Sequence, residues 1–207
     1  MDTILRPEQP TDDAAITQLT LAAFTSASYK PTEHLIIQGL RESGALSLSL
    51  VAQVKGRIVG HVAFSKVTIN GEDMDWYGLG PISVQPELQK LGIGSRLMQD
   101  GLSRISDMGA KGCVVLGSPL SYHRFSFKSL PGLIYERVPA PEYFMAIPFR
   151  DEIPQGKVEY HRAFYTTDLE KKRYQDPNLI QVFLREPPMV PFRYNADIRI
   201  LSVGPMI

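Results

Sequence analysis

The sequence contains very little cysteine and no excess of charge of either sign. Cys113 is the only cysteine among the 207 residues, and 22 basic side chains balance 22 acidic ones. A single cysteine excludes an internal disulfide and any zinc site built from clustered cysteines. Proteins that bind nucleic acid usually carry a basic excess, which is missing here, so no nucleic-acid partner is expected.

Long apolar runs and a leader-like start are also missing. No run of about 18 apolar residues occurs, so no segment is expected to span a membrane. Residues 1–10 lack the basic start and apolar block of a secretory signal. Hydrophobic residues make up 43% of the chain and charged residues 21%, which is typical of a soluble globular protein. Together these observations favour a cytoplasmic protein.

The apolar pattern of the first half predicts two helices followed by three antiparallel strands. Helical spacing begins near residue 11 and recurs over residues 31–43, whereas strict alternation over residues 46–54 indicates a strand. The pairs Lys55-Gly56 and Asn70-Gly71 favour tight hairpin turns. Return strands are therefore predicted over residues 58–69 and 73–84.

The second half predicts a crossover rather than another hairpin. A polar loop over residues 85–91 precedes a helix over residues 92–108, and the apolar run 113–116 is typical of a strand covered on both faces. A short helix at residues 120–125 and strands at 133–137 and 143–147 follow. This order predicts an α/β (α+β) fold, with a mixed, mostly antiparallel twisted sheet flanked by helices, in one domain over residues 1–164.

Residues 165–207 differ in composition from this domain. Five prolines occur from position 177 onward, together with two short apolar runs at 179–184 and 198–203. The segment is too apolar for a typical disordered tail and too short for a core of its own. We expect a C-terminal extension that docks on its own domain or on a second subunit of a homodimer.

The stretch over residues 82–95 carries the most chemical information. A predicted strand leads through a loop into Gly92 and Gly94 at the start of a helix, where free amides and the helix dipole favour an anion. Lys90 adds positive charge nearby. A dinucleotide fingerprint would need a glycine where Leu97 stands, and the spacing of a P-loop is absent. An ordinary glycine-rich helix entry is the alternative interpretation.

The string from Gln89 to Gly94, Q-K-L-G-I-G, resembles the Q/R-x-x-G-x-G/A motif of the GNAT superfamily of N-acetyltransferases. The longer string from Leu79 resembles a bacterial branch of predicted acetyltransferases, and the order of elements agrees over residues 1–164. The resemblance implies acetyl-CoA as cosubstrate and a primary amine, on a small molecule or a peptide, as acceptor. It also implies direct attack without a covalent enzyme intermediate.

The resemblance assigns cofactor contacts residue by residue. The strand before the loop would meet the pantetheine arm through its main chain, at Ile82, Ser83 and Val84. The loop and helix start would face the phosphates, at Gln89, Lys90, Leu91, Gly92, Ile93, Gly94 and Ser95. Pro81 cannot donate a ladder hydrogen bond, which predicts a bulge within this strand.

A second similarity to the family concerns Tyr122. It precedes Phe127 at the family's spacing, although Ser126 stands where the family has glycine. The resemblance implies that Tyr122 is the general acid, because a phenol of pKa about 10 can protonate a departing thiolate whose thiol has a pKa of about 8.5. The alternative is that Tyr122 only packs against the cofactor.

A general base is also needed, and the sequence offers several candidates. Glu72, Asp73 and Asp75 flank a predicted turn, where acidic residues are usually only solvated. His61 lies within a predicted strand and is either a proton shuttle or a buried, hydrogen-bonded histidine. Cys113 lies in an apolar run, which favours an inert core thiol.

The remaining candidates have ordinary structural alternatives. Neither His123 nor His161 has metal-ligand spacing with other ligating residues, so no metal site is predicted. Trp76, Tyr77 and Phe24 could line an acceptor pocket or belong to the core. Two rival functions stay open: a non-catalytic module that binds or senses acyl-CoA, and an interaction protein that uses its proline-rich extension.

Overall fold

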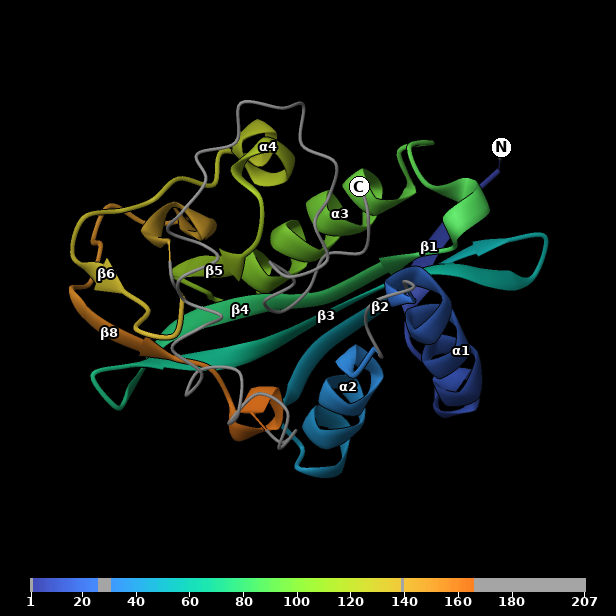
Figure 1. Cartoon of the computed structure of the whole chain (residues 1–207), viewed down its shortest axis with the longest axis horizontal. Coiled ribbons are helices and arrows are strands. Elements are labelled where there is room, and N and C mark those ends of the chain that lie inside the picture. Colours follow the sequence, from blue (N-terminus) through green and yellow to red (C-terminus); the bar gives the residue numbers. More distant parts are fainter. Residues whose placement is uncertain (1, 26–30, 139, 166–207) are drawn as a thin grey trace, which may run out of the picture.

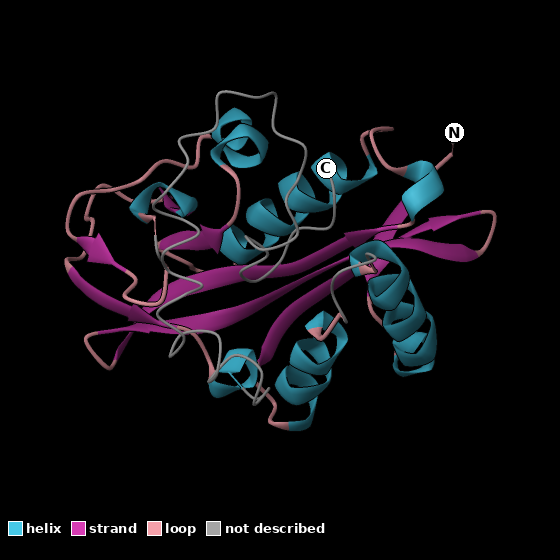
Figure 2. Cartoon of the chain, in the orientation of Figure 1, coloured by secondary structure: helices cyan, strands magenta, loops and turns pink. Residues whose placement is uncertain are grey.

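The computed structural model describes residues 2–25, 31–138 and 140–165 of the chain. The extension predicted for residues 165–207 therefore lies outside the described residues, apart from its first position. In the described ranges, four α-helices flank a sheet (Figures 1 and 2). The helices are α1 (Asp13–Phe24), α2 (Glu33–Glu42), α3 (Ile93–Asp107) and α4 (Pro119–Tyr122).

One mixed sheet forms the centre of the molecule. Its strands are β1 (Ile4–Pro7), β2 (Leu46–Val54), β3 (Arg57–Ile69), β4 (Glu72–Val84), β5 (Gly112–Leu116), β6 (Leu133–Ile134), β7 (Phe144–Pro148) and β8 (Gly156–Glu159). Along the main path the order is β1-β2-β3-β4-β5-β7, while β8 pairs with both β3 and β6. Among the strand pairs of the described residues, only β4–β5 and β6–β8 are parallel. The predicted fold class is therefore confirmed.

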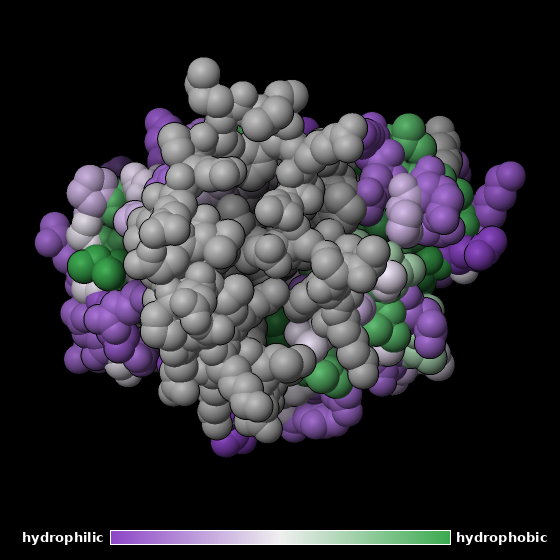
Figure 3. Space-filling view, in the orientation of Figure 1, coloured by the Kyte–Doolittle hydropathy of each residue, from purple (hydrophilic) through white to green (hydrophobic). Residues whose placement is uncertain are grey.

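The two hairpin turns that join β2, β3 and β4 form where the sequence predicts them. Lys55 and Gly56 have φ of 49° and 77°, and Asn70 and Gly71 have φ of 53° and 81°. These left-handed conformations match the twist of the flanking strands, and glycine and asparagine adopt them readily. In the space-filling view, hydrophilic residues gather at the two ends of the long axis, over these turns (Figure 3).

Helices cover both faces of the sheet. In Figure 1, α3 and α4 lie on one face and α1 and α2 on the other. On the α3 side, the helix packs closely against β3. A Cβ atom added at Gly101 would lie 2.4 Å from the Phe64 ring, and one at Gly60 would lie 2.8 Å from Leu97. Glycine at these positions lets α3 approach β3 closely, which fixes the start of α3 relative to the sheet.

Among the last strands, one is shorter than predicted and another was missed. The strand expected over residues 133–137 ends at Ile134, because its partner β8 leaves it after Lys157 and pairs with Ile69 and Thr68 of β3 instead. β8 itself was not predicted. Its sequence, Gly-Lys-Val-Glu, contains one apolar residue and so shows no alternation that would indicate a strand.

The strands β4 and β5 pair over only part of their length. The parallel pairing joins residues Trp76 to Leu79 with Gly112 to Val115. Leu79 and Ile82 pair with Phe64 and Val62, so Gly80 and Pro81 stand opposite a single residue of β3. This is a β-bulge, which confirms the irregularity predicted at Pro81. Beyond it, β4 continues along β3, and no described strand pairs with its other edge.

Candidate active site

The loop between β4 and α3 is shaped by two left-handed residues. Lys90 has φ of 62°, and Gly92, the residue that caps the N-terminus of α3, has φ of 83°. A short 3-10 turn over Pro86–Leu88 begins the loop, and the Gln89 side chain donates a hydrogen bond to the carbonyl of Val84 (3.2 Å). Gln89 therefore ties the loop back to the end of β4.

The amides at the start of α3 are available to a ligand. Among the described residues, no backbone hydrogen bond is donated by the amides of residues 90–95, and no side chain caps the helix. Lys90, Leu91 and Gly92 are exposed, whereas the side chain of Ile93 packs against β3. Free amides at a helix start attract an anion through hydrogen bonds and the helix dipole.

The outer edge of β4 beside this loop offers main-chain groups. The amide of Gln85 donates to the carbonyl of Val59 on β3 (2.9 Å). Successive residues of a strand direct their hydrogen-bonding groups to opposite sides, so Ser83 also faces β3, while Ile82 and Val84 face the gap toward β5. An extended ligand could hydrogen-bond to these two residues as a strand would.

Tyr122 lies at the end of α4 and is completely buried. Its ring meets that of Phe127 edge to face, with 5.8 Å between centroids. Both rings belong to the apolar cluster on the α3 side that also contains Ile82 and Val115, so the structure brings Tyr122 to the same cluster as the open edge of β4. Ser126 adopts the left-handed conformation (φ 69°) usually reserved for glycine.

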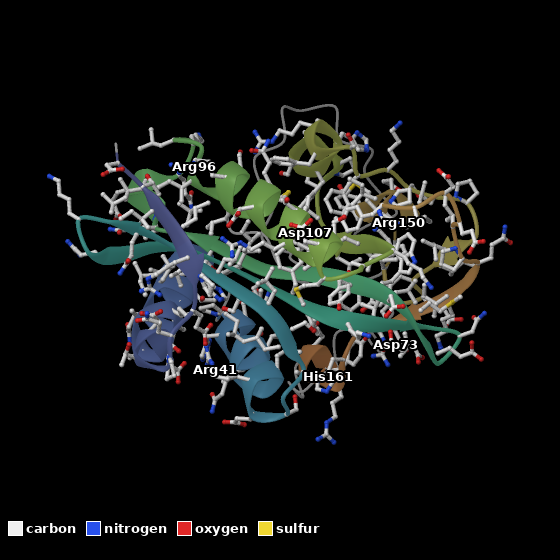
Figure 4. All side chains as sticks on the ribbon, turned by 180° about the vertical axis from the view of Figure 1, so that it is seen from behind. Arg41, Asp73, Arg96, Asp107, Arg150 and His161 are labelled. Atoms are coloured by element: carbon white, nitrogen blue, oxygen red, sulfur yellow. The ribbon has the colours of Figure 1, made fainter. Side chains whose placement is uncertain are left out.

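Several sequence candidates lie away from this gap. Asp73 and Asp75 form ion pairs with Lys66 (2.6 and 3.2 Å), and Glu72 is exposed beside them. They stand near the start of β4, about 23–33 Å along the strand from Ile82, at about 3.3 Å per residue. Figure 4 shows Asp73 at that end of the sheet, away from Arg96 near the start of α3.

The other candidates are core or surface residues. Phe24, Trp76 and Tyr77 are buried, the last two within apolar clusters. Burial raises the pKa of the Cys113 thiol, as expected for an inert core thiol. His123 is exposed. In the part of the chain that the structure describes, no three His, Cys, Asp or Glu side chains are placed to hold a metal ion. None of the helices described there is long and apolar enough to cross a membrane.

A polar network that the sequence did not predict lies under the sheet, on the α1/α2 face. His61 of β3 is fully buried, and its Nε2 lies 2.8 Å from the Ser49 hydroxyl on β2. Ser49 donates a short hydrogen bond to Glu8, and Glu8 accepts one from Arg41 of α2 (2.8 Å). Arg41 also pairs with Asp13 of α1 (2.7 Å), and Figure 4 shows it on this face.

The network has marked electrostatic consequences. Burial alone would raise the pKa of Glu8, but His61, Arg41 and Ser49 together outweigh it and lower that pKa to about 2. Burial lowers the pKa of His61, and the nearby Glu8 carboxylate opposes this effect only in part. Glu8 is therefore charged and His61 is neutral at pH 7.

These features first define the class of the protein. The described residues combine a mixed sheet that opens between two parallel strands with a helix start that has free amides and with a buried tyrosine, an arrangement that suits an α/β acyltransferase. Residues 14–120, more than half of the chain, match the Acetyltransferase (GNAT) family. The chain belongs to this family, as its resemblance to the family motifs predicts.

Relatives of known structure agree with this assignment. A GNAT family acetyltransferase from Brucella melitensis, solved in complex with acetyl-CoA, is 43% identical and has a TM-score of 0.70; the match covers 79% of this chain and 98% of that one. The GNAT family N-acetyltransferase YhbS of Escherichia coli, solved in complex with CoA, is 32% identical and has a TM-score of 0.73. This match covers 79% of this chain and 92% of that one.

Sequence comparison finds the same relative among curated proteins. The uncharacterized N-acetyltransferase YhbS of Escherichia coli K12 is 36% identical over 126 residues, which is 60% of this chain and 73% of that protein. The uncharacterized N-acetyltransferase YjhQ of the same organism is 38% identical over 94 residues, which is 44% of this chain and 51% of that protein.

Proposed function

We propose that this acetyltransferase takes its acetyl group from acetyl-CoA and transfers it to a primary amine by direct attack. The supporting observation is the juxtaposition of two groups of main-chain atoms that have no backbone partner among the described residues. The amides at the start of α3 lie next to the open edge of β4. A pyrophosphate fits the first group and an amide-bearing pantetheine arm fits the second, and acetyl-CoA contains both in sequence.

The proposed contacts follow from this placement. The amides of Leu91, Gly92, Ile93, Gly94 and Ser95 bind the pyrophosphate, with Lys90 supplying positive charge. Ile82 and Val84 pair with the pantetheine arm, Ser83 holds this part of β4 against β3, and Gln89 holds the loop in place. Two relatives, one from Brucella melitensis solved with acetyl-CoA and one from Escherichia coli solved with CoA, support acetyl-CoA as the cosubstrate.

Direct transfer requires two proton movements. The amine nitrogen attacks the thioester carbonyl carbon, a C–N bond forms, and the C–S bond then breaks. We assign Tyr122 as the acid that protonates the leaving thiolate, because it is buried in the cluster that flanks the open edge. Burial excludes water, which strengthens the effect of a positioned donor on developing charge.

The wider organisation is proposed on the same basis. Residues 1–164 form the acetyltransferase domain of a cytoplasmic protein, and residues 165–207 dock on this domain or on a second subunit. The acceptor is a small molecule or a peptide that carries a primary amine.

Cofactor binding is tested by a matched pair of glycine variants. Gly92→Asp places a carboxylate where the pyrophosphate would bind, and we expect acetyl-CoA affinity to fall at least about tenfold, which is about 1.4 kcal/mol. Gly71→Asp is the control, because Gly71 has nearly the same φ (81° against 83°), and a Cβ atom would be equally uncrowded there. Equal affinities in calorimetric titrations of the two variants would contradict the proposed phosphate site.

Transfer itself is tested with a panel of primary amines. The purified protein is supplied with acetyl-CoA, and release of free thiol is followed alongside mass analysis of the amine. We expect acetylation of at least one amine in the panel. Tight acetyl-CoA binding without transfer to any amine would favour the non-catalytic binding or sensing module instead.

A further inference from the structure

His61 is held in one tautomer by its hydrogen-bonded neighbours. The Ser49 hydroxyl has a single hydrogen, which it donates to the Glu8 carboxylate. Toward His61 the same oxygen can therefore only accept, so the hydrogen of this 2.8 Å contact is on Nε2. A neutral imidazole with its hydrogen on Nε2 has a free lone pair on Nδ1. Within the described part of the chain, Nδ1 is buried and has no hydrogen-bond partner.

The free nitrogen faces away from β2, and the strand on that side of β3 is β4. Imidazole presents its two nitrogens in roughly opposite directions, and Nε2 points to Ser49 on β2. Because β3 lies between β2 and β4, Nδ1 is directed to the β4 side. His61 is the direct cross-strand partner of Ser83, which lies in the segment beyond the bulge. Paired residues share one face of a sheet, with Cβ atoms about 5 Å apart.

This geometry places a base on the face opposite the proposed acid. Tyr122 belongs to the cluster on the α3 side, whereas His61 and the hydroxyl of Ser83, bonded to Thr20 of α1 (3.3 Å), lie on the α1/α2 side. An amine that attacks a thioester held along the open edge must approach one face of its carbonyl. The α1/α2 face offers a buried proton acceptor beside that edge.

We propose that Nδ1 of His61 is the general base that accepts the proton of the acceptor amine, directly or through one water molecule. The proposal rests on the direct-transfer function proposed above. As the C–N bond forms, the nitrogen becomes positively charged and loses one proton to Nδ1. As the C–S bond breaks, the thiolate takes one proton from Tyr122. The imidazolium and the tyrosinate then return to neutrality by proton exchange with solvent, which leaves an amide and free thiol.

The surrounding charges suit this role. Glu8 lies 3.7 Å from Nε2 and stabilises the imidazolium that forms, while Asp13 partly neutralises Arg41, the cation that would oppose it. Because burial lowers the pKa of His61, the ring is uncharged at neutral pH and ready to accept a proton. Glu8 and Ser49 act as positioning residues, since they fix the tautomer without meeting the substrate.

The principal test is His61→Gln. The glutamine amide can still donate to Ser49 where Nε2 did, but it has no basic nitrogen. We expect kcat to fall about 10²-fold, in line with the loss of one positioned base, while acetyl-CoA affinity is unchanged. Ser65→Ala is the matched control, because Ser65 is also buried on the same face of β3, and its hydroxyl has no partner in the described ranges. The control should keep the wild-type kcat.

A pH titration separates a chemical role from a structural one. Nitrogen NMR of the histidine ring, recorded without substrate, should show hydrogen on Nε2 and a free Nδ1 at pH 7, with a pKa below 6.5. The acid limb of the kcat profile reports the same ionisation in the substrate complex and should disappear in His61→Gln. In Glu8→Gln, both the limb and the NMR pKa should move to lower pH, because the negative charge that favours the imidazolium is removed.

These experiments distinguish failure of the His61 role from failure of the proposed acetyl transfer. A wild-type protein that acetylates no amine contradicts direct transfer and this proposal together. Normal kcat in His61→Gln, or an NMR spectrum with hydrogen on Nδ1, overturns the role of His61 alone. Should His61→Gln fail to fold, a kcat limb that does not move in Glu8→Gln overturns it equally.

Discussion

The two faces of the central sheet both carry apolar clusters but differ in their buried polar groups. The face toward α3 is closed by aliphatic and aromatic side chains, with glycines at Gly60 and Gly101 that let the helix approach. The face toward α1 and α2 contains a chain of polar groups that runs from His61 through Ser49 and Glu8 to Arg41. One face therefore fixes the loop that is proposed to hold the donor. The other holds charged groups next to His61, the proposed base.

The largest expected effect tests whether the apolar face also contributes chemistry. Tyr122→Phe keeps the ring and its contact with Phe127 and removes only the hydroxyl. We expect turnover to fall by about 10² to 10⁴, the usual contribution of one positioned acid. Acetyl-CoA affinity should change little, because the thiolate charge exists only near the transition state. Steady-state kinetics and calorimetry on one preparation provide both numbers; wild-type turnover would exclude Tyr122 as the acid.

The next effect concerns the stability that the apolar face supplies. Leu97→Ala removes a fully buried side chain that packs against β3 at Gly60, and we expect the free energy of unfolding to fall by about 2–5 kcal/mol. Leu91→Ala is the matched control, because Leu91 is 62% exposed in the loop and its truncation should change stability by less than about 0.5 kcal/mol. Denaturant titration measures the free energy of unfolding of both variants. Equal losses in the two variants would mean that the packing of Leu97 against β3 does not stabilise the fold.

A smaller effect should distinguish the polar face by its dependence on pH. The pKa of Glu8 falls from 4.5 to about 2 on folding, so its contribution of about 3 kcal/mol is present above pH 4.5 and is lost as pH falls toward 2. Glu8→Gln should lower stability at pH 7 by about 2–3 kcal/mol. The difference from wild type should shrink below pH 4.5. A difference that stays constant down to pH 3, or an equal loss in the exposed Glu72→Gln, would contradict this account.

The smallest effect concerns the turn that follows Tyr122. Ser126 is held at φ 69°, where a side chain costs free energy that glycine does not. Ser126→Gly should therefore raise the free energy of unfolding by up to about 1 kcal/mol, since part of the relief is offset by the greater freedom of glycine in the unfolded chain. Thermal melting with Ser121→Gly as a control in the preceding helix, where glycine should destabilise, tests the sign.

Much of the apolar face could be predicted from sequence because its determinants are local. Alternation over residues 46–54, the two hairpin turns and the helical spacing after Gly92 each lie within a few neighbouring residues. The loop over residues 85–92, proposed to bind phosphate, could be predicted for the same reason, because a helix start with a left-handed glycine provides its own free amides. The bulge at Pro81 was predictable for the same reason: proline has no amide to donate.

The polar face could not be predicted because its partners are distant in sequence. Arg41 and Glu8 are 33 positions apart, and Ser49 and Glu8 are 41 apart. Each of these residues, taken alone, has the pattern of an ordinary surface position. The sequence leaves His61 either a proton shuttle or a buried histidine. Its tautomer follows only from the register of β2 and β3, which places Ser49 beside it. The pairing of β8 with two strands likewise depends on tertiary contacts.

The half-paired state of β4 has a consequence for how the protein behaves without its substrates. Beyond the bulge, β4 has an unpaired edge although it lies in the middle of the sheet. On the side toward β5, no described strand pairs with the main-chain groups of Ile82 and Val84. Exposed edges recruit other strands and promote aggregation. An extended cosubstrate arm along the same edge would cap it. We therefore expect hydrogen exchange at these two amides to slow sharply when acetyl-CoA binds, and the solution to resist aggregation best in its presence.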